Sequence, residues 1–149
     1  MDKIKLFKEE YLEKSAKLLI LTFNREPWNE NWTFETAFKR LEETYKTPNF
    51  KGWVYEKDNK IVGVIMGNCE QWYEGTQYYI KDFFVDANIQ KQGIGSKMLK
   101  HLERELKDLD VNFIHFWTLK GEKTEKFYKN NGYELPNTLT LMTKDLDSE

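Results

Sequence analysis

Apolar and polar residues recur along this chain with two different periods, which separate predicted helices from predicted strands. Four segments repeat apolar residues every three or four positions, as amphipathic helices do, and the others alternate or are continuously apolar, as strands are. The predicted strands are 3–7, 52–57, 60–68, 76–85, 111–119, 133–135 and 138–144. The predicted helices are 9–23, 33–45, one that starts at Ile94, and 122–131.

Local signals mark where several of these elements begin and end. Asp58-Asn59 between two strand patterns predicts a hairpin turn. Thr33 is the predicted N-cap of the second helix, with Thr36 at the position where a capping box normally has Glu. Gly132 predicts a left-handed C-cap for the last helix.

Composition narrows the class of protein. At 149 residues, 40% of them hydrophobic, the chain is expected to form a single domain over 1–149, and the 15% of aromatic residues predict a core or cleft built of rings. The net charge of −2 argues against general nucleic-acid binding. One cysteine allows no intrachain disulfide and favours a reducing compartment. No membrane span or signal peptide is evident, so we expect a cytoplasmic protein.

The segment 90–96 joins the aromatic strand pattern ending at Val85 to the helix that starts at Ile94. The first N–H groups of a helix have no intrahelical partner, and Gly93 and Gly95 leave them open to a ligand. This arrangement favours a phosphate site, while a simple tight turn is the alternative. Neither the dinucleotide fingerprint nor the Walker loop fits, because Met98 stands where the third glycine of the fingerprint belongs and Gly95 is followed by Ser96-Lys97.

Two segments carry a resemblance to a known family. Gln90-Lys91-Gln92-Gly93-Ile94-Gly95 fits the pattern Gln/Arg-x-x-Gly-x-Gly/Ala, and Phe127-Tyr128-Lys129-Asn130-Asn131-Gly132-Tyr133 looks like Phe-Tyr-x-x-x-Gly-Phe. Both are typical of the GNAT superfamily, the Gcn5-related N-acetyltransferases. The resemblance implies an α/β (α+β) acyl-CoA N-acyltransferase fold, with the order β-α-α-β-β-β-α-β-α-β-β around a mixed, mainly antiparallel sheet.

The resemblance also implies a cofactor and the residues that hold it. Acetyl-coenzyme A would bind with its pyrophosphate over the backbone N–H groups of the segment Gln92–Ser96, with Gln90 and Lys91 beside them. A bulge in the central strand would expose backbone groups to the thioester, at Phe84 and Val85. Tyr128 matches the family tyrosine that protonates the leaving thiolate; the alternative is that it only packs. Gly121 stands where the family often has a cofactor-contacting Asn, which Lys126 or Lys129 would have to compensate.

The general base is less determined by the sequence. Asp82 stands in an aromatic run three residues before Val85, so it either serves the cleft as base or amine anchor or pairs with a neighbour such as Lys81. Glu70 and Glu74 are alternatives, and a water chain is another. Cys69 could be an acyl-carrying nucleophile but is far more typical of a small apolar filler. His101 and His115 lack ligand spacing, so no metal is expected.

Aromatic and acidic residues suggest the acceptor site. The candidates are Trp28, Glu30, Trp32, Trp72 and Glu74, with Glu26 beside them. Rings with carboxylates suit a cationic amine, and the run Pro-Trp-Asn-Glu-Asn-Trp resembles aminoglycoside 6′-acetyltransferases and their unassigned relatives. The alternative is that both tryptophans brace the connection between the helices.

The resulting hypothesis is an acetyl-CoA-dependent N-acetyltransferase acting on the primary amine of a small, cationic acceptor by direct attack on the thioester. A protein N-terminal or lysine acetyltransferase and a non-catalytic CoA-binding regulatory module remain as alternatives. No nucleic acid or membrane is expected as a partner, and the sequence leaves open whether the chain is a monomer or a homodimer.

Overall fold

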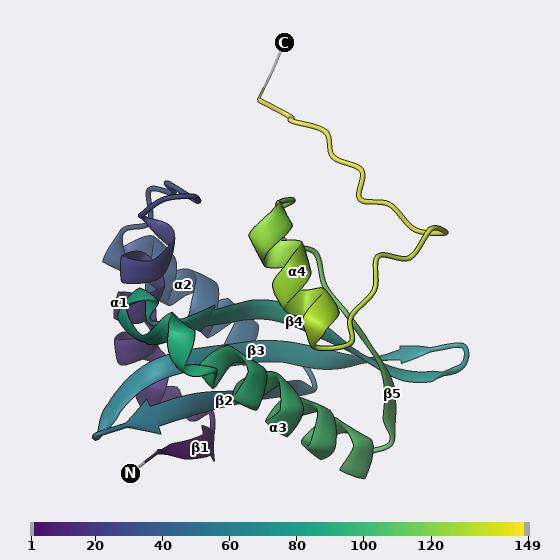
Figure 1. Ribbon diagram of the computed structural model, residues 1–149, viewed down its shortest axis with the longest axis horizontal. Coiled ribbons are helices and arrows are strands. Elements are labelled where there is room, and N and C mark those ends of the chain that lie inside the picture. The colour runs from purple at the N-terminus through teal and green to yellow at the C-terminus, as the bar shows by residue number, and fades with distance from the viewer. Residues whose placement is uncertain (1, 148–149) are drawn as a thin grey trace. The chain divides into compact units, whose positions relative to one another are not determined.

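The computed structural model describes residues 2–147, apart from the side chains of Gln90 and Lys91 (Figure 1). The chain divides into two compact units, one ending at Phe116 and one starting at Trp117, and each is described by itself. The single domain over 1–149 stays a prediction. The first unit contains β1 (Lys3–Leu6), the short helical turn η1 (Glu9–Tyr11), α1 (Leu12–Phe23), α2 (Phe34–Tyr45), β2 (Phe50–Lys57), β3 (Lys60–Trp72), β4 (Gly75–Val85), η2 (Ala87–Gln92), α3 (Ile94–Asp108) and β5 (Val111–His115); the second contains α4 (Glu122–Asn130).

One five-stranded sheet organises the first unit, in the order β1-β2-β3-β4-β5. All neighbours are antiparallel except β4 and β5, which are parallel. Parallel neighbours need a crossover, and α3 supplies it. The mixed, mainly antiparallel sheet is therefore confirmed.

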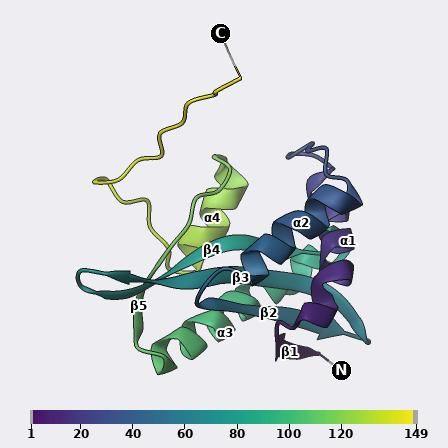
Figure 2. The same ribbon diagram turned by 180° about the vertical axis from the view of Figure 1, so that it is seen from behind.

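Helices cover both faces of this sheet. Figure 1 shows α3 in front of the sheet, and Figure 2, from behind, shows α1 and α2 on the other face. On the α1 and α2 side, Leu19 and Leu41 pack with Val64 and Phe84 in a fully or almost fully buried cluster. On the α3 side, Trp53 lies 6.0 Å from the ring of His101. Side chains of a strand alternate between the two faces of the sheet, and helices cover both faces here. The central strands therefore bury apolar side chains on both faces.

The expected caps and turns are present. Thr33 caps α2 and Thr36 completes the capping box with its hydroxyl, so Thr replaces the usual Glu. Asp58 and Asn59 both have positive φ angles, 51° and 64°, as a tight hairpin turn requires. Gly132 follows α4 with φ 88°, and the N–H of Tyr133 donates to the Tyr128 carbonyl. None of the described helices is both long and apolar enough to cross a membrane.

Two expectations about strands are wrong. The predicted strand 111–119 ends at His115, and Phe113 and Trp117 are more than half exposed instead of buried. The predicted strands 133–135 and 138–144 do not form among the described residues. Leu139, Leu141 and Met142 of that segment are exposed, and two short strands that bury so little apolar surface are not stable as an isolated hairpin.

A bulge interrupts the pairing of β3 with β4. Met66 pairs with Asp82 but its neighbour Gly67 pairs with Ile80, so Lys81 is the extra residue on β4. Bulges bend a strand and re-aim its groups, and they are frequent beside active sites. A Cβ at Gly67 would collide with the Tyr79 carbonyl oxygen, which explains the glycine opposite the bulge.

We expect Gly67→Ala to destabilise the protein strongly. Its methyl group would overlap backbone that can move only by opening the β3–β4 ladder. Overpacking a core costs about 1–3 kcal/mol. Urea denaturation of Gly67→Ala should therefore show that the free energy of unfolding falls by about 3 kcal/mol or more. Gly121→Ala is the control, because nothing lies within 4 Å of its Cβ position and its loss should stay below about 1 kcal/mol. Equal losses would contradict the close packing at the bulge.

Candidate functional site

The sheet is open between β4 and β5. Their parallel ladder covers Thr76 to Tyr79 of β4 and ends at the pair Tyr79–His115, whereas β4 continues to Val85. Beyond that pair, no described strand forms a ladder with β4 on the β5 side, because β5 ends at His115. Strand edges carry N–H and C=O groups that can pair with an extended ligand. The bulge at Lys81 lies two residues past the end of this ladder.

A helix start lies at the end of β4. One residue, Asp86, joins Val85 to η2, and α3 begins after Gly93, whose φ is 76°. A left-handed residue at this point favours glycine, and the space that a Cβ of Gly93 would enter is empty within 4 Å. No side chain caps α3, and the first backbone bond of the helix runs from the Lys97 N–H to the Gly93 carbonyl. The turn predicted over Gln92–Ser96 is therefore an uncapped N-terminus, which suits an anion.

The members of this loop contribute in different ways. Ile94 is 1% exposed and anchors the start of α3 in the core, so only its backbone can serve a ligand. Gln92 is exposed, and its side-chain oxygen accepts a hydrogen bond from the Lys57 ammonium. The side chains of Gln90 and Lys91 lie outside the described residues. Their predicted roles, like those of Gly95 and Ser96, stay predictions.

Lys57 is a cation at this loop that the sequence analysis missed. It ends β2, and the sheet brings the β2–β3 turn to the end of β4, where Val85 pairs with Gly63. The only signal in the sequence was the hairpin turn right after Lys57, which carries no information about β4. Lys97, in contrast, lines a separate hollow of about 300 Å³ with Tyr55 and Arg104.

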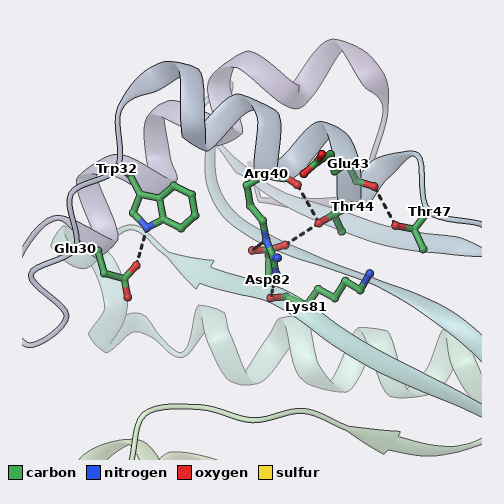
Figure 3. Close-up of polar contacts among 8 residues, drawn as sticks. All are labelled: Glu30, Trp32, Arg40, Glu43, Thr44, Thr47, Lys81 and Asp82. Atoms are coloured by element: carbon green, nitrogen blue, oxygen red, sulfur yellow. Dashed lines mark hydrogen bonds and ion pairs between the residues drawn. The ribbon is translucent and has the colours of Figure 1, made fainter. Parts of the chain in front are cut away.

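Asp82 is paired, and its partner differs from the expected one. Its side chain is 9% exposed; Oδ1 accepts from Arg40 Nε at 3.2 Å, and Oδ2 accepts from the Thr44 hydroxyl at 3.3 Å (Figure 3). The suggested neighbour Lys81 instead lies 5.9 Å from the ring of Tyr79. Burial raises the pKa of the Asp82 carboxyl, and the nearby Arg40 opposes that rise. Each carboxylate oxygen thus has a partner within the protein, and the role of Asp82 as base or amine anchor stays a prediction.

The loop between α1 and α2 reaches the same end of β4. The ring of Trp28 packs on Phe23 at 5.1 Å, and Phe23 packs on Phe84 at 5.7 Å, so a chain of rings joins the loop to the strand. The indole N–H of Trp32 donates to Glu30 at 2.6 Å. A hollow of about 320 Å³ is lined by Glu30, Asn31, Trp32 and Thr36. Three of the predicted acceptor residues therefore lie on one short loop.

Trp72 and Glu74 lie elsewhere. Trp72 ends β3 and Glu74 lies in the turn to β4, at the end of β4 opposite Val85. Gly75 and Val85 are ten positions apart on the strand, a span of about 33 Å. Trp72 is 53% exposed and its ring contacts Tyr73. The structure does not bring this pair together with Trp28, Glu30 and Trp32.

The backbone irregularity of β4 also lies elsewhere than expected. Phe84 and Val85 pair regularly with Val64 and Gly63, three and four residues beyond the bulge at Lys81. Phe84 is 4% exposed and belongs to the core on the α1 and α2 face. The bulge therefore precedes the two residues that the resemblance indicates, and their predicted contact with the thioester stays a prediction.

Tyr128 lies in the second unit, on α4. Its ring contacts Phe127 at 5.1 Å and Tyr133 at 6.0 Å. Burial raises the pKa of Tyr128 to about 12, so its phenol stays protonated at neutral pH. Gly121 is the N-cap of α4, and its N–H donates to Glu125 at 3.1 Å.

The remaining reactive side chains have other surroundings. Burial raises the pKa of the Cys69 thiol, which makes it a poor nucleophile. His101 pairs with Glu105 at 3.4 Å, and His115 stacks on Tyr79 at 4.9 Å. Within residues 2–147, no three His, Cys, Asp or Glu side chains gather closely enough to hold a metal ion.

Comparison with known proteins agrees with this geometry. Residues 17–133 match the model of a family described as Acetyltransferase (GNAT) family, across both units. A possible acetyltransferase from Clostridium difficile 630 superposes with a TM-score of 0.82 at 16% identity, covering 98% of this chain and 99% of that one.

Two further similar structures are of acetyltransferases with a named activity. An aminoglycoside acetyltransferase from an uncultured soil metagenomic sample, in complex with sisomicin, has a TM-score of 0.76 at 23% identity, covering 98% of this chain and 97% of that one. Glucosamine-6-phosphate N-acetyltransferase from Arabidopsis thaliana has a TM-score of 0.69 at 20% identity, with 99% of each chain covered. At these identities the likeness establishes the fold.

The start of α3 yields a charge-specific prediction. Gly93→Asp and Gly93→Asn insert side chains of the same size, and both residues tolerate a left-handed backbone. They differ in charge, so only the aspartate should repel a phosphate at the helix N-terminus. We expect calorimetry to show coenzyme A binding at least about tenfold weaker for Gly93→Asp than for Gly93→Asn. Equal affinities of the two variants would reject this loop as the pyrophosphate site.

Proposed function

The chain belongs to the GNAT acetyltransferase family, and we propose that it carries an acetyl group from acetyl-CoA to the primary amine of a small, cationic acceptor. The amine nitrogen attacks the thioester carbonyl carbon, the C–S bond breaks, and the thiolate takes up a proton. This family uses acetyl-CoA as its cosubstrate. The observation that carries the proposal is the end of the β4–β5 ladder at Tyr79, on the strand that leads to a helix start without a side-chain cap.

These two features fit the two parts of coenzyme A. The β4 edge offers backbone groups to the amides of an extended pantetheine arm. The N-terminus of α3 and the Lys57 ammonium suit the pyrophosphate, because one offers the positive end of a helix dipole and the other a positive charge. Bound coenzyme A supplies the activated acetyl group, and the residues of this chain orient it and handle the protons.

Tyr128 is our proposed acid for the leaving thiolate. A phenol with its pKa near 12 keeps its proton and can donate it as negative charge develops on sulfur. We propose no single carboxylate as general base, since Asp82 is fully engaged. Water can remove the proton from the attacking amine.

Glu30, Trp28 and Trp32 are the proposed acceptor residues. One oxygen of the Glu30 carboxylate accepts from Trp32, and the side chain borders the hollow of about 320 Å³. A carboxylate next to indole rings attracts a cationic amine through charge and cation–π contact. An aminoglycoside acetyltransferase among the similar structures was determined with sisomicin, which supports an amine-rich small molecule as a first substrate class.

Two other functions remain distinguishable by assay. A protein N-terminal or lysine acetyltransferase would prefer peptides over small amines. A non-catalytic CoA-binding module would bind acetyl-CoA and transfer nothing. Thermal-shift measurements with acetyl-CoA, followed by thiol release over a panel of small amines and peptides, separate all three.

Tyr128→Phe should lower kcat about ten- to a thousand-fold with little change in the affinity for acetyl-CoA, because it removes one hydroxyl and little packing. Tyr133→Phe is the control: it removes the hydroxyl of the ring that contacts Tyr128 and should leave kcat within about threefold of the wild-type value. Turnover should be measured by thiol release at saturating acceptor.

The pH dependence tests the same assignment. The acid form of Tyr128 is complete below its raised pKa and is lost as pH rises through about 12, so its ionisation should not lower kcat up to pH 10. A phenol with the ordinary pKa of about 10 would already be half ionised there. Wild-type turnover in Tyr128→Phe would reduce this residue to packing.

Glu30→Gln should raise the KM for a cationic acceptor several-fold, because the amide still accepts from Trp32 but carries no charge. The wild-type kcat/KM should also fall as salt rises, since exposed charge attraction is screened over about 10 Å at 0.1 M. Glu35→Gln, an exposed position in the first turn of α2, is the matched control and should leave KM unchanged. A neutral or anionic preferred acceptor without salt dependence would contradict the cationic-acceptor proposal.

A further inference from the structure

Arg40 connects helix α2 to the bulge of β4 by two separate bonds. Its Nε donates to Asp82 Oδ1 at 3.2 Å, and its Nη2 donates to the backbone carbonyl of Lys81 at 3.1 Å. Lys81 is the extra residue of the bulge. Figure 3 shows the Arg40 side chain running from α2 down to the strand, where it meets both groups. One guanidinium therefore holds two consecutive residues of β4.

The bulge needs such a partner. An extra residue in a strand does not pair in the ladder, so its backbone groups must be satisfied from elsewhere. On the other side of β4 the ladder with β5 ends at Tyr79, two residues before Lys81. The bulge thus lies where β4 has lost its β5 partner, and Arg40 supplies the contact that the sheet does not.

Asp82 serves as the anchor of Arg40 in this arrangement. Its carboxylate accepts from Arg40 and from Thr44, which lies one helical turn after Arg40 on α2. The Thr44 hydroxyl also lies 3.1 Å from the Arg40 carbonyl. These contacts fix the guanidinium so that its second donor points at the Lys81 carbonyl, and they leave the carboxylate without a free oxygen.

We propose that Arg40 is a positioning residue for acetyl transfer: it fixes the β4 bulge and so sets the course of the strand that continues to Phe84 and Val85, whose backbone groups are predicted to face the thioester. The inference rests on the proposed acetyltransferase function. Small displacements of a reacting group are costly to turnover even when binding persists. Arg40 therefore acts on the rate, while the loop at Gly93 carries the affinity for the cofactor.

Arginine is required by this role because its planar fork donates two bonds in fixed directions, whereas a lysine ammonium is a point charge on a flexible stem. We therefore expect Arg40→Lys to keep a positive charge near Asp82 and still lose alignment. Arg40→Met keeps the apolar stem and loses both bonds. Lys46→Met is the matched control, since it removes an exposed ion pair with Glu42 from the same helix.

Measurements of kcat and of acetyl-CoA affinity distinguish a loss of alignment at the bulge from a general loss of folding. Arg40→Met and Arg40→Lys should lower kcat at least about tenfold, with the affinity for acetyl-CoA by calorimetry within about threefold of wild type. Lys46→Met should match wild type in both. Hydrogen exchange should show faster exchange of the amides around Lys81 in Arg40→Met and unchanged exchange there in Lys46→Met.

A double variant separates positioning from charge neutralisation. If Arg40 only neutralised the Asp82 carboxylate, Arg40→Met/Asp82→Asn would regain turnover; if it holds the bulge, the double variant stays slow. Asp82→Asn alone keeps an oxygen for Arg40, so it should turn over at least about tenfold faster than Arg40→Met, whereas a base role for Asp82 would make it as slow.

The outcomes tell the two proposals apart. An active wild-type enzyme with an equally active Arg40→Met variant, or a double variant restored to wild-type turnover, would overturn the positioning role alone. A wild-type protein that binds acetyl-CoA and acetylates no amine would refute the proposed function, and the positioning role with it.

Discussion

The parting of β4 from β5 is the constraint on which the rest of the structure depends. A central strand normally has a partner on each side, and β4 has two only up to Tyr79. The second half of the strand must keep its course with one neighbour, β3, and with whatever its two faces contact. Phe84 supplies apolar packing against α1, and Arg40 supplies a polar contact from α2. These two contacts hold the part of β4 that lies beyond its ladder with β5.

The contact between Arg40 and Asp82 carries a cost of desolvation. Taking the Asp82 carboxylate out of water raises its pKa even though Arg40 and Thr44 contact it, so pairing does not fully offset desolvation. Removing one partner of a fully buried ion pair costs about 3–5 kcal/mol. The Arg40 side chain is 41% exposed, so the cost of losing it falls below that range. Replacing a buried ion pair with apolar side chains is often neutral or stabilising, so stability alone does not account for this pair, whereas the fixed course of β4 does.

Local rules sufficed for much of the fold, and they failed where distant segments meet. The Thr33 cap, the Asp58-Asn59 turn and the left-handed Gly132 depend on neighbours in sequence, and all were predicted. The extent of β5 depends on where β4 leaves it, and residues 133–144 depend on a strand partner, so periodicity misjudged both. Arg40 and Lys57 were missed because their partners lie 42 and 35 positions away. Trp72 was grouped with Trp28 by composition, whereas β4 holds them at opposite ends.

Helix α2 combines two tasks on successive turns. Thr36, in its first turn, borders the hollow beside Glu30 and Trp32, and Arg40 and Thr44 hold the strand one and two turns later. A helix is stiff, so any shift of its first turn that reshapes the hollow is carried to the bulge. The α1–α2 loop instead reaches β4 through Trp28, Phe23 and Phe84, three residues past the bulge. Redesign of the acceptor range is therefore better started in residues 24–32 than in the first turn of α2, where one change would alter acceptor binding and turnover together.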